Sequence, residues 1–261
     1  MTPIYDCIGQ FYTKFRHPDL RIVDRIIHLL ALEKDSIIAD IGAGTGNYSR
    51  AIGDCGFFIR AIEPSSVMRQ QASQHPRVQW IESYAENIPL ETASVDASIC
   101  VLASHHFSNL KKAVQEMHRV MKKGPVVFLT FDPKADNNFW LFDYFPSFKQ
   151  FDSQLFLPID EFTKLIETST NRQVEISTFW LPHDLTDMFA AAGWRRPEIY
   201  LNPKIRKCIS AFALADANLV EQGIKLLKED LNSGRWKAEY GAIEELEEID
   251  LGYRFLGARL S

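Results

Sequence analysis

The stretch from Ile37 to Arg50, IIADIGAGTGNYSR, constrains the fold more than any other part of this sequence. The apolar run over 37–39 is typical of a buried strand, and a helix is expected to begin near Asn47. Between them lie three glycines at alternate positions, Gly42, Gly44 and Gly46. Glycine adopts positive φ without a Cβ clash, and a helix start presents unpaired N–H groups to a polar or anionic group. A strand, a glycine turn and a helix start in this order predict a nucleotide-binding turn.

Two carboxylates near this turn indicate which nucleotide it binds. Glu63 closes the expected second strand over 57–63, 21 positions after Gly42, where an acid can accept hydrogen bonds from both ribose hydroxyls. The glycine pattern is G-x-G-x-G, and Asn47 stands where a dinucleotide fingerprint has its last glycine. Asp40, two residues before the first glycine, can take a cationic amine. S-adenosylmethionine has such an amine and NAD has none near its pyrophosphate, so the pattern favours S-adenosylmethionine.

Four segments in order then resemble the motifs of class I S-adenosylmethionine-dependent methyltransferases. ADIGAGTGNYSRAI resembles the first motif, IRAIEPSSVMRQQA the next, AENIPLETASVDASICVLASHHF the third and fourth, and EMHRVMKKGPVVFLT the following helix and fifth strand. The resemblance covers Ala31 to Asp132 and is closest to the ubiquinone/menaquinone-biosynthesis-like group of small-molecule methyltransferases. It implies an α/β, Rossmann-like fold: a seven-stranded, mostly parallel sheet with antiparallel strand seven, helices on both faces and a helical, aromatic lid insertion.

The resemblance also implies the cofactor site. Glu86 would accept from the adenine amino group, Ala85 would offer a backbone N–H to the ring, and Met68 would pack on the adenine. Otherwise Glu86 is a solvated loop acid and Met68 a core residue. The residues expected around S-adenosylmethionine, or its product S-adenosylhomocysteine, are Asp40, Gly42, Ala43, Gly44, Gly46, Asn47, Glu63, Pro64, Met68, Ala85, Glu86, Ala103 and Tyr12.

The N-terminal segment has two interpretations. Apolar residues at helical spacing over 22–30, entered at Pro18-Asp19, predict a helix that packs on the sheet. Before it, Tyr5 and Tyr12 either pack in the same way or, as in similar methyltransferases, reach over the cofactor and acceptor together with Arg16.

The fourth expected strand, 95–103, ends in Ser104-His105-His106-Phe107. Strand ends on this side of an open parallel sheet face the ligand crevice, so His105 or His106 is a candidate general base. The alternative is that one ring only shapes the cofactor pocket. Adjacent histidines on extended backbone point in different directions, and no cysteine or acid lies at metal spacing nearby, so no metal site is predicted.

Beyond Asp132 the resemblance thins, and an aromatic segment over 139–148 occupies the place of a lid. It forms a lid core, an apolar acceptor pocket, or a mixture of both, which we favour; the pocket residues would be Trp140, Phe142, Tyr144 and Phe148. Later elements are expected as a helix capped by Asp160, an edge strand over 174–180, a helix from Asp184 to 192, strand six over 198–201 and strand seven over 253–260. The predicted division is a cofactor-binding core with an N-terminal helical segment over 1–132, a lid over 133–182, and completion of the core with a helical insertion over 183–261.

Composition narrows the function further. A net charge of −5 gives no basic field for nucleic acid, and no leader or long apolar span appears, so we expect a cytoplasmic protein without a membrane partner. We expect transfer of a methyl group to a small organic acceptor, in secondary-metabolite (for example antibiotic) or quinone-like biosynthesis, by a monomer or homodimer. An RNA or protein methyltransferase and a non-catalytic S-adenosylmethionine-binding module remain alternatives.

Overall fold

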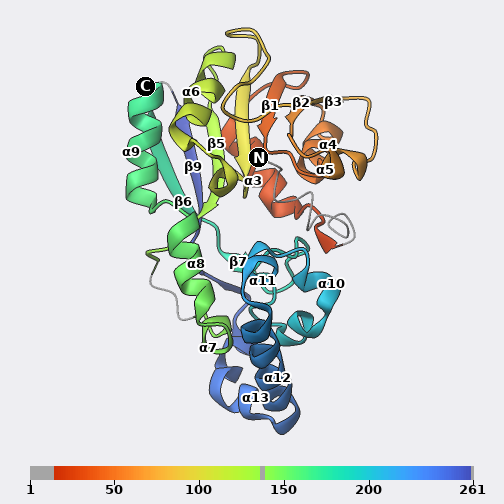
Figure 1. Ribbon diagram of the computed structural model, residues 1–261. Helices are drawn as coiled ribbons and strands as arrows, with labels where there is room; N and C mark the ends of the chain where they lie inside the picture. Colours follow the sequence, from red (N-terminus) through yellow and green to blue (C-terminus); the bar gives the residue numbers. More distant parts are fainter. Residues whose placement is uncertain (1–14, 136–138, 260–261) are drawn as a thin grey trace.

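The computed structural model describes residues 15–135 and 139–259, so the expectations for Tyr5 and Tyr12 lie outside the described residues (Figure 1). A seven-stranded sheet in the order β3-β2-β1-β4-β5-β9-β6 forms the core. Its strands are β1 Ile37–Ile41, β2 Phe58–Ile62, β3 Val78–Ile81, β4 Ala97–Val101, β5 Val126–Phe131, β6 Gln173–Thr178 and β9 Tyr253–Arg259. Only β9 runs antiparallel to its neighbours, β5 and β6. The predicted mostly parallel sheet with an antiparallel seventh strand is confirmed.

Helices cover both faces of the sheet. One face carries α3 (Leu20–Leu30) and α4 (Asn47–Asp54), and the other carries α6 (Leu110–Val120) and α9 (Ile159–Thr170). Successive strand side chains point to opposite faces, so Val127 of β5 joins the first hydrophobic cluster and Phe128 the second. Continuous burial along β5 follows from this double covering.

Side-chain caps set the starts of three core helices. The carboxylate of Asp19 accepts from the N–H of Arg21 at the start of α3, and Ser65 accepts from Met68 at the start of α5 (Ser66–Gln70). Asn109 does the same for α6. Each side chain satisfies an N–H that has no partner within its helix. Asp160 was expected to cap α9, but that helix begins at Ile159 after Pro158, and Asp160 lies inside its first turn.

A helical lobe lies beyond the carboxyl ends of the strands and is made of two insertions (Figure 1). The first, between β5 and α9, holds α7 Leu141–Tyr144 and α8 Ser147–Leu155. The second, between β6 and β9, holds β7 Leu181–Pro182, η3 Pro197–Leu201, α10 Pro203–Arg206, α11 Ser210–Leu214, α12 Ala217–Ser233, α13 Arg235–Tyr240, η4 Gly241–Glu245 and β8 Glu248–Ile249. In the core, β6 pairs with β9 and α9 packs against α6. The predicted lid over 133–182 includes both elements, and that division of the chain stays a prediction.

Two elements expected in the second insertion are corrected by the structure. Residues 198–201 lie in the 3-10 helix η3 rather than in strand six, whose place at the sheet edge is taken by β6. The helix expected from Asp184 is a run of turns. Three of its backbone carbonyls accept from side chains that follow the segment, two from the guanidinium of Arg196 and one from the Tyr200 hydroxyl. Such tertiary partners replace the bonds that a helix would have made.

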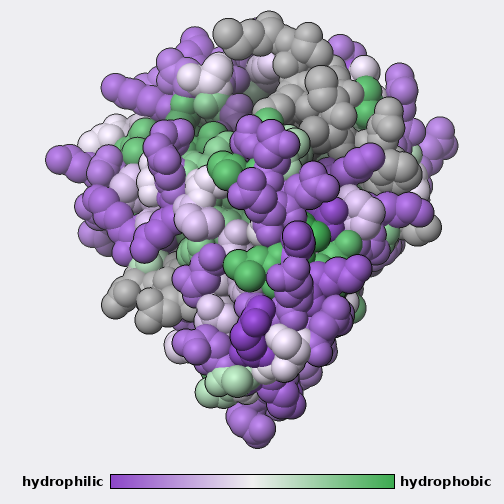
Figure 2. Space-filling view, turned by 60° about the horizontal axis from the view of Figure 1, so that its bottom comes forward, coloured by the Kyte–Doolittle hydropathy of each residue, from purple (hydrophilic) through white to green (hydrophobic). Residues whose placement is uncertain are grey.

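Aromatic side chains fill the lobe. Trp140 lies at their centre, with ring edges against Tyr144, Tyr200 and Trp236. Its indole N–H donates to the carbonyl of Trp194 at 2.7 Å. Figure 2 shows a mainly hydrophilic exterior on the face where the bottom of the molecule comes forward, with hydrophobic residues in small patches. No helix in the described ranges is both long and apolar enough to cross a membrane.

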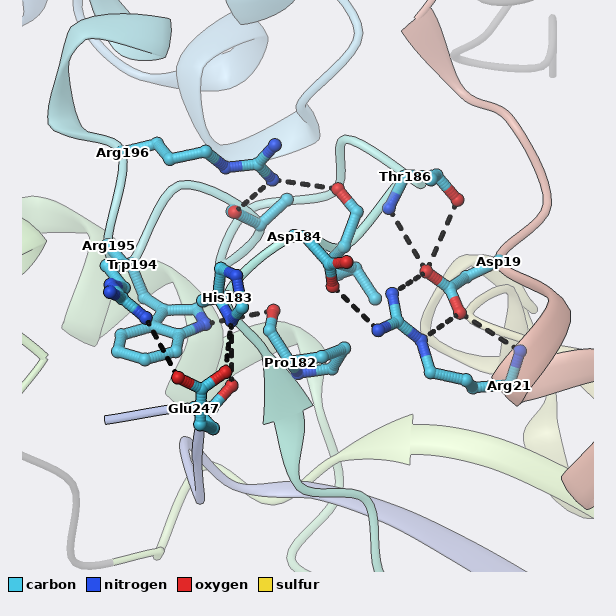
Figure 3. A network of polar contacts seen from close by, with 12 residues as sticks. Asp19, Arg21, Pro182, His183, Asp184, Thr186, Trp194, Arg195, Arg196 and Glu247 are labelled. Carbon is cyan, nitrogen blue, oxygen red and sulfur yellow. Dashed lines mark hydrogen bonds and ion pairs between the residues drawn. The ribbon is translucent and has the colours of Figure 1, made fainter. Parts of the chain in front are cut away.

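A polar network joins the lobe to the N-terminal end of α3 (Figure 3). The Asp19 carboxylate accepts from the backbone N–H of Thr186 at 3.1 Å, and Arg21 bridges Asp19 and Asp184. The Asp19 side chain is almost fully buried, and its hydrogen bonds hold the pKa of that carboxyl below its ordinary value although burial alone would raise it. The same residue therefore caps α3 and fixes the segment that leads into the lobe.

Candidate active site

A cavity of about 700 Å³ opens where four parallel strands end. Gly42 follows β1, Glu63 follows β2, Ser83 lies just beyond β3, and Leu102 follows β4. Ligands of open α/β sheets bind outside the carboxyl ends of the strands, so the topology places a binding site here. The predicted site residues that it brings together in the wall are Gly42, Ala43, Gly44, Asn47, Glu63, Pro64, Met68, Ala85, Glu86, Ala103, His105 and His106.

The glycine turn owes its shape to backbone that only glycine adopts readily. Gly42, Gly44 and Gly46 have φ of 74°, 60° and 73°. A Cβ on Gly42 would lie 2.6 Å from the Cβ of Ala103, whereas one on Gly44 would meet nothing nearer than Met68 at 3.4 Å. The backbone at Gly42 is therefore packed against the loop after β4, and the backbone at Gly44 faces the cavity.

Glu63 connects the end of β2 to this turn. One carboxylate oxygen accepts from the N–H of Gly44 at 2.9 Å and the other from the N–H of Ser65 at 2.8 Å. Burial raises the pKa of this carboxyl to about 7, although the two backbone bonds oppose the shift. A group that donates hydrogen bonds from the cavity would favour the ionised form.

The structure does not bring Asp40 and Gly46 to the cavity wall. Asp40 is 2% exposed, and its carboxylate accepts from the hydroxyl of Ser49 at 2.5 Å. The alternation along β1 explains this, because Asp40 points to the face that α4 covers, as Ile38 does. Gly46 instead lies against the ring of Trp80. In this position the Asp40 carboxylate holds α4 through Ser49, and its contact with a cationic amine stays a prediction.

Glu86 joins two loops of the cavity rim. Its carboxylate accepts from the Ser108 hydroxyl at 2.9 Å and from the N–H of Asn109 at 3.0 Å. This contact ties the loop after β3 to the loop after β4, so Ala85 and Glu86 keep a fixed position at one end of the cavity. A contact with adenine stays a prediction.

Sequence and structure comparisons place this arrangement among known proteins. Residues 39–129 match the family model described as a methyltransferase domain. A structure from Anabaena variabilis, named "Putative methyltransferase from antibiotic biosynthesis pathway", is 54% identical with a TM-score of 0.92, over 94% of this chain and 99% of that one.

The chain belongs to the class I S-adenosylmethionine-dependent methyltransferases. It is also similar to a ubiquinone/menaquinone biosynthesis C-methyltransferase of Campylobacter jejuni, 34% identical over 42% of this chain and 51% of that protein. A phosphoethanolamine N-methyltransferase of Haemonchus contortus, solved with S-adenosyl-L-methionine, shares the fold at 16% identity and a TM-score of 0.63, over 97% of this chain and 56% of that one. The chain spans about half the length of the curated relatives it matches.

The residues of this methyltransferase fit S-adenosylmethionine. The cavity volume lies within the range of about 300–1,000 Å³ typical of small-molecule sites. Two buried polar atoms in its wall, the hydroxyl of Thr45 and Nδ1 of His105, have no hydrogen-bond partner among the described residues. Buried polar atoms are normally satisfied, so both await a ligand or water. Within 15–135 and 139–259, no group of three or more histidine, cysteine or acidic residues is placed to hold a metal.

The two histidines of the methyltransferase lie in a 3-10 turn, η2 Ser104–His106, directly after β4. Their ring centroids are 3.9 Å apart. Burial lowers the pKa of His106 to about 4 and that of His105 well below its ordinary value, and the charge of Arg16 acts in the same direction. Both rings are therefore neutral near pH 7.

The aromatic residues expected to line an acceptor pocket do not reach this cavity. Trp140, Tyr144 and Phe148 are almost fully buried in the lobe, and Phe142 packs against them. These contacts fit a lid core, because the rings find partners in η3 and α13 that the sequence does not reveal. The favoured mixture of lid core and acceptor pocket stays a prediction.

Arg16 lies in the cavity wall next to Tyr48 and Asp187, two wall residues that sequence reasoning missed. Asp187 accepts from both Arg16 and the hydroxyl of Tyr48, the latter at 2.9 Å. Asp187 is only 1% exposed, so the pair is a buried ion pair with an added hydrogen bond. No local pattern marks it, since Asp187 stands 139 residues after Tyr48. The Arg16 carbonyl also accepts from the Asn47 side chain, which ties the N-terminal segment to the glycine turn.

Proposed function

We propose that this protein transfers the methyl group of S-adenosylmethionine to a small organic acceptor. The observation that carries the proposal is one cavity in which the glycine turn, the Ala85–Glu86 loop and the His105-His106 turn converge at the ends of four parallel strands. When bound, S-adenosylmethionine supplies a methyl group on a sulfonium centre that leaves without covalent help from the protein. The protein then has to bind, orient and exclude water.

The wall residues divide into those that hold the nucleoside and those that hold the methionine part. We assign the ribose hydroxyls to Glu63, because it lies in the cavity wall and each of its carboxylate oxygens, which accepts one backbone N–H, can accept a further hydrogen bond. The adenine would lie by Met68 and between Pro64 and the Ala85–Glu86 loop. Thr45 and the backbone at Gly44 remain for the methionine part, since the Thr45 hydroxyl has no other described partner. The wall offers Asn47 and the η2 turn as the remaining polar surface.

In this proposal, most of the rate enhancement comes from positioning the acceptor in line with the methyl group. Holding two reactants in line can contribute on the order of 7–11 kcal/mol. If the acceptor must lose a proton, His105 or His106 is the base we propose, and such a base adds about 10²–10⁴-fold. Their neutral state leaves the ring lone pairs available, while the lowered pKa values limit their strength as bases.

Small-molecule biosynthesis is the context that the relatives support. One similar structure carries an antibiotic-pathway name, and the curated relatives include quinone-biosynthesis enzymes. The negative net charge of −5 also argues against a nucleic-acid substrate. We propose a monomer or homodimer acting on a metabolite.

Isothermal titration with S-adenosylhomocysteine and incubation of labelled S-adenosylmethionine with metabolite extracts test the proposal together. We expect saturable binding and a labelled small-molecule product. His106→Gln should slow product formation and leave binding unchanged, and His118→Gln, on α6 away from the cavity, is the matched control. Failure of S-adenosylhomocysteine to bind would overturn the site. Tight binding without labelled product from any extract would favour a binding module instead.

A further inference from the structure

A second cavity of about 60 Å³ adjoins the cofactor cavity. The two share Arg16, Leu102 and His105 in their walls, so the smaller one lies directly behind the η2 turn. Its other walls come from α8, from the start of β9 and from the segment that leads into α11. It therefore sits between the core and the lobe. We call it the Asp152 chamber, after the acid of α8 in its wall.

Aromatic rings form much of the Asp152 chamber. The rings of His105 and Phe156 have centroids 4.2 Å apart, and those of Phe189 and Tyr253 are 4.7 Å apart. All four residues line the chamber. Ring faces carry partial negative charge, so a cation that meets one of these faces is attracted to it.

Among the described residues that line the chamber, Asp152 is the only one with a carboxylate side chain. Its side chain has no hydrogen-bond or ion-pair partner in the described part of the chain, and burial alone raises its pKa to about 7. The other titratable groups around it do not supply a counter-charge. Arg16 is already paired with Asp187, the His105 ring is neutral, and burial keeps the Tyr253 phenol protonated. An unpaired carboxylate in an apolar setting is costly, so the chamber is complementary to a group that brings both positive charge and donors.

We propose that the Asp152 chamber is the subsite for a cationic ammonium group of the methyl acceptor. This inference rests on the proposed function, since it places an acceptor whose body continues into the shared part of the larger cavity. A volume of about 60 Å³ has room for roughly four to six water-sized groups, enough for an ammonium head and a short alkyl arm. The acceptor class that follows is a small amine, with the ammonium as an anchor rather than as the methylated atom.

The test uses 2-phenylethylammonium as probe and 2-phenylethanol as its neutral counterpart, with S-adenosylhomocysteine saturating the cofactor cavity. Ligand-observed NMR at pH 8 gives the two dissociation constants. We expect the ammonium to bind at least about tenfold more tightly than the alcohol, because a charged hydrogen bond and a cation–π contact are both lost in the alcohol. Asp152→Asn should reduce this preference to within about twofold.

Asp160→Asn is the matched control, because Asp160 is an exposed aspartate of the neighbouring helix α9 and should leave the preference intact. Titration with S-adenosylhomocysteine reports on folding in each variant and should give wild-type affinity. An equal or tighter affinity for the alcohol, or a preference that survives Asp152→Asn, would overturn the inference while leaving the methyltransferase proposal standing. Failure of S-adenosylhomocysteine to bind the wild-type protein would remove both.

Discussion

Replacing Glu63 with glutamine perturbs the contact on which the cofactor site depends. The two carboxylate oxygens accept from the backbone N–H groups of Gly44 and Ser65 at 2.9 and 2.8 Å. Glutamine has one acceptor oxygen and one donor amide, so one of these N–H groups must then face another N–H. A buried donor left unpaired costs about 1–3 kcal/mol, and in the proposed site the ribose hydroxyls would lose a charged acceptor of similar value. We expect the affinity for S-adenosylhomocysteine to fall about 10- to 100-fold, equivalent to about 1.4–2.8 kcal/mol.

The same substitution should change how stability depends on pH. Burial raises the pKa of Glu63 from its ordinary 4.5 to about 7 in the folded protein. Because the folded state binds this proton more tightly than the unfolded state, the associated stability is fully present below pH 4.5 and is lost as the pH rises through 7. The difference between the two pKa values corresponds to about 3 kcal/mol. Glutamine does not titrate. Between pH 4.5 and 8 the free energy of unfolding should therefore fall by about 3 kcal/mol less in Glu63→Gln than in the wild type.

Calorimetric titration with S-adenosylhomocysteine measures the affinity. Urea unfolding of the cofactor-free protein across pH 4.5 to 8 measures how the free energy of unfolding changes with pH. The difference between wild type and variant isolates Glu63 from the buried Asp40 and the half-buried Asp152, whose pKa values burial also raises. Glu91→Gln, at an exposed position remote from the cavity wall, should change neither quantity. A Glu63→Gln protein with wild-type affinity and a wild-type pH slope would refute the reasoning about this carboxylate.

Three further substitutions test the turn, the lobe and the buried ion pair. Gly42→Ala should cost about 1–3 kcal/mol of stability and weaken S-adenosylhomocysteine binding, because at positive φ the new Cβ would lie 2.6 Å from the Cβ of Ala103. Thermal unfolding and calorimetric titration measure the two effects. Gly241→Ala, at a position with φ of −58°, is the control and should change neither. Trp140→Phe should lower the free energy of unfolding by about 1–3 kcal/mol, because the Trp194 carbonyl loses its hydrogen-bond donor, and should leave cofactor affinity within twofold. Loss of turnover at unchanged stability would instead indicate that Trp140 lines an acceptor pocket. Asp187→Asn should destabilise by about 3 kcal/mol in urea unfolding because Arg16 keeps a buried charge, and a loss no greater than that of the exposed Asp184→Asn would contradict this.

Much of the cofactor site could be predicted from short stretches of sequence. The glycine turn and the start of α4 at Asn47 depend on backbone preferences and hydrogen bonds within a few residues, and both lie where predicted. Even Glu63 reaches the turn through pairing of β1 with β2, the first crossover of such a sheet. Local interactions of this kind are nearly independent of the rest of the chain.

Side-chain direction at the site was decided by tertiary structure. Asp40 belongs to the same motif as the glycines, yet the pleat of β1 and the covering helix α4 turn it toward Ser49 and away from the cavity. A sequence motif gives the type of a residue, but which face of a strand is covered by which helix depends on the whole sheet.

By itself, the sequence determined the sheet core and the glycine turn after β1, because these follow from local φ preferences and apolar periodicity. Only the tertiary structure decided how the lobe is built and what faces the acceptor. The bond from Trp140 to Trp194 spans 54 residues and the pair of Arg16 with Asp187 spans 171. Such partners leave no periodic trace in the chain, since their energy comes from burial and hydrogen bonding between segments that meet only in the folded protein.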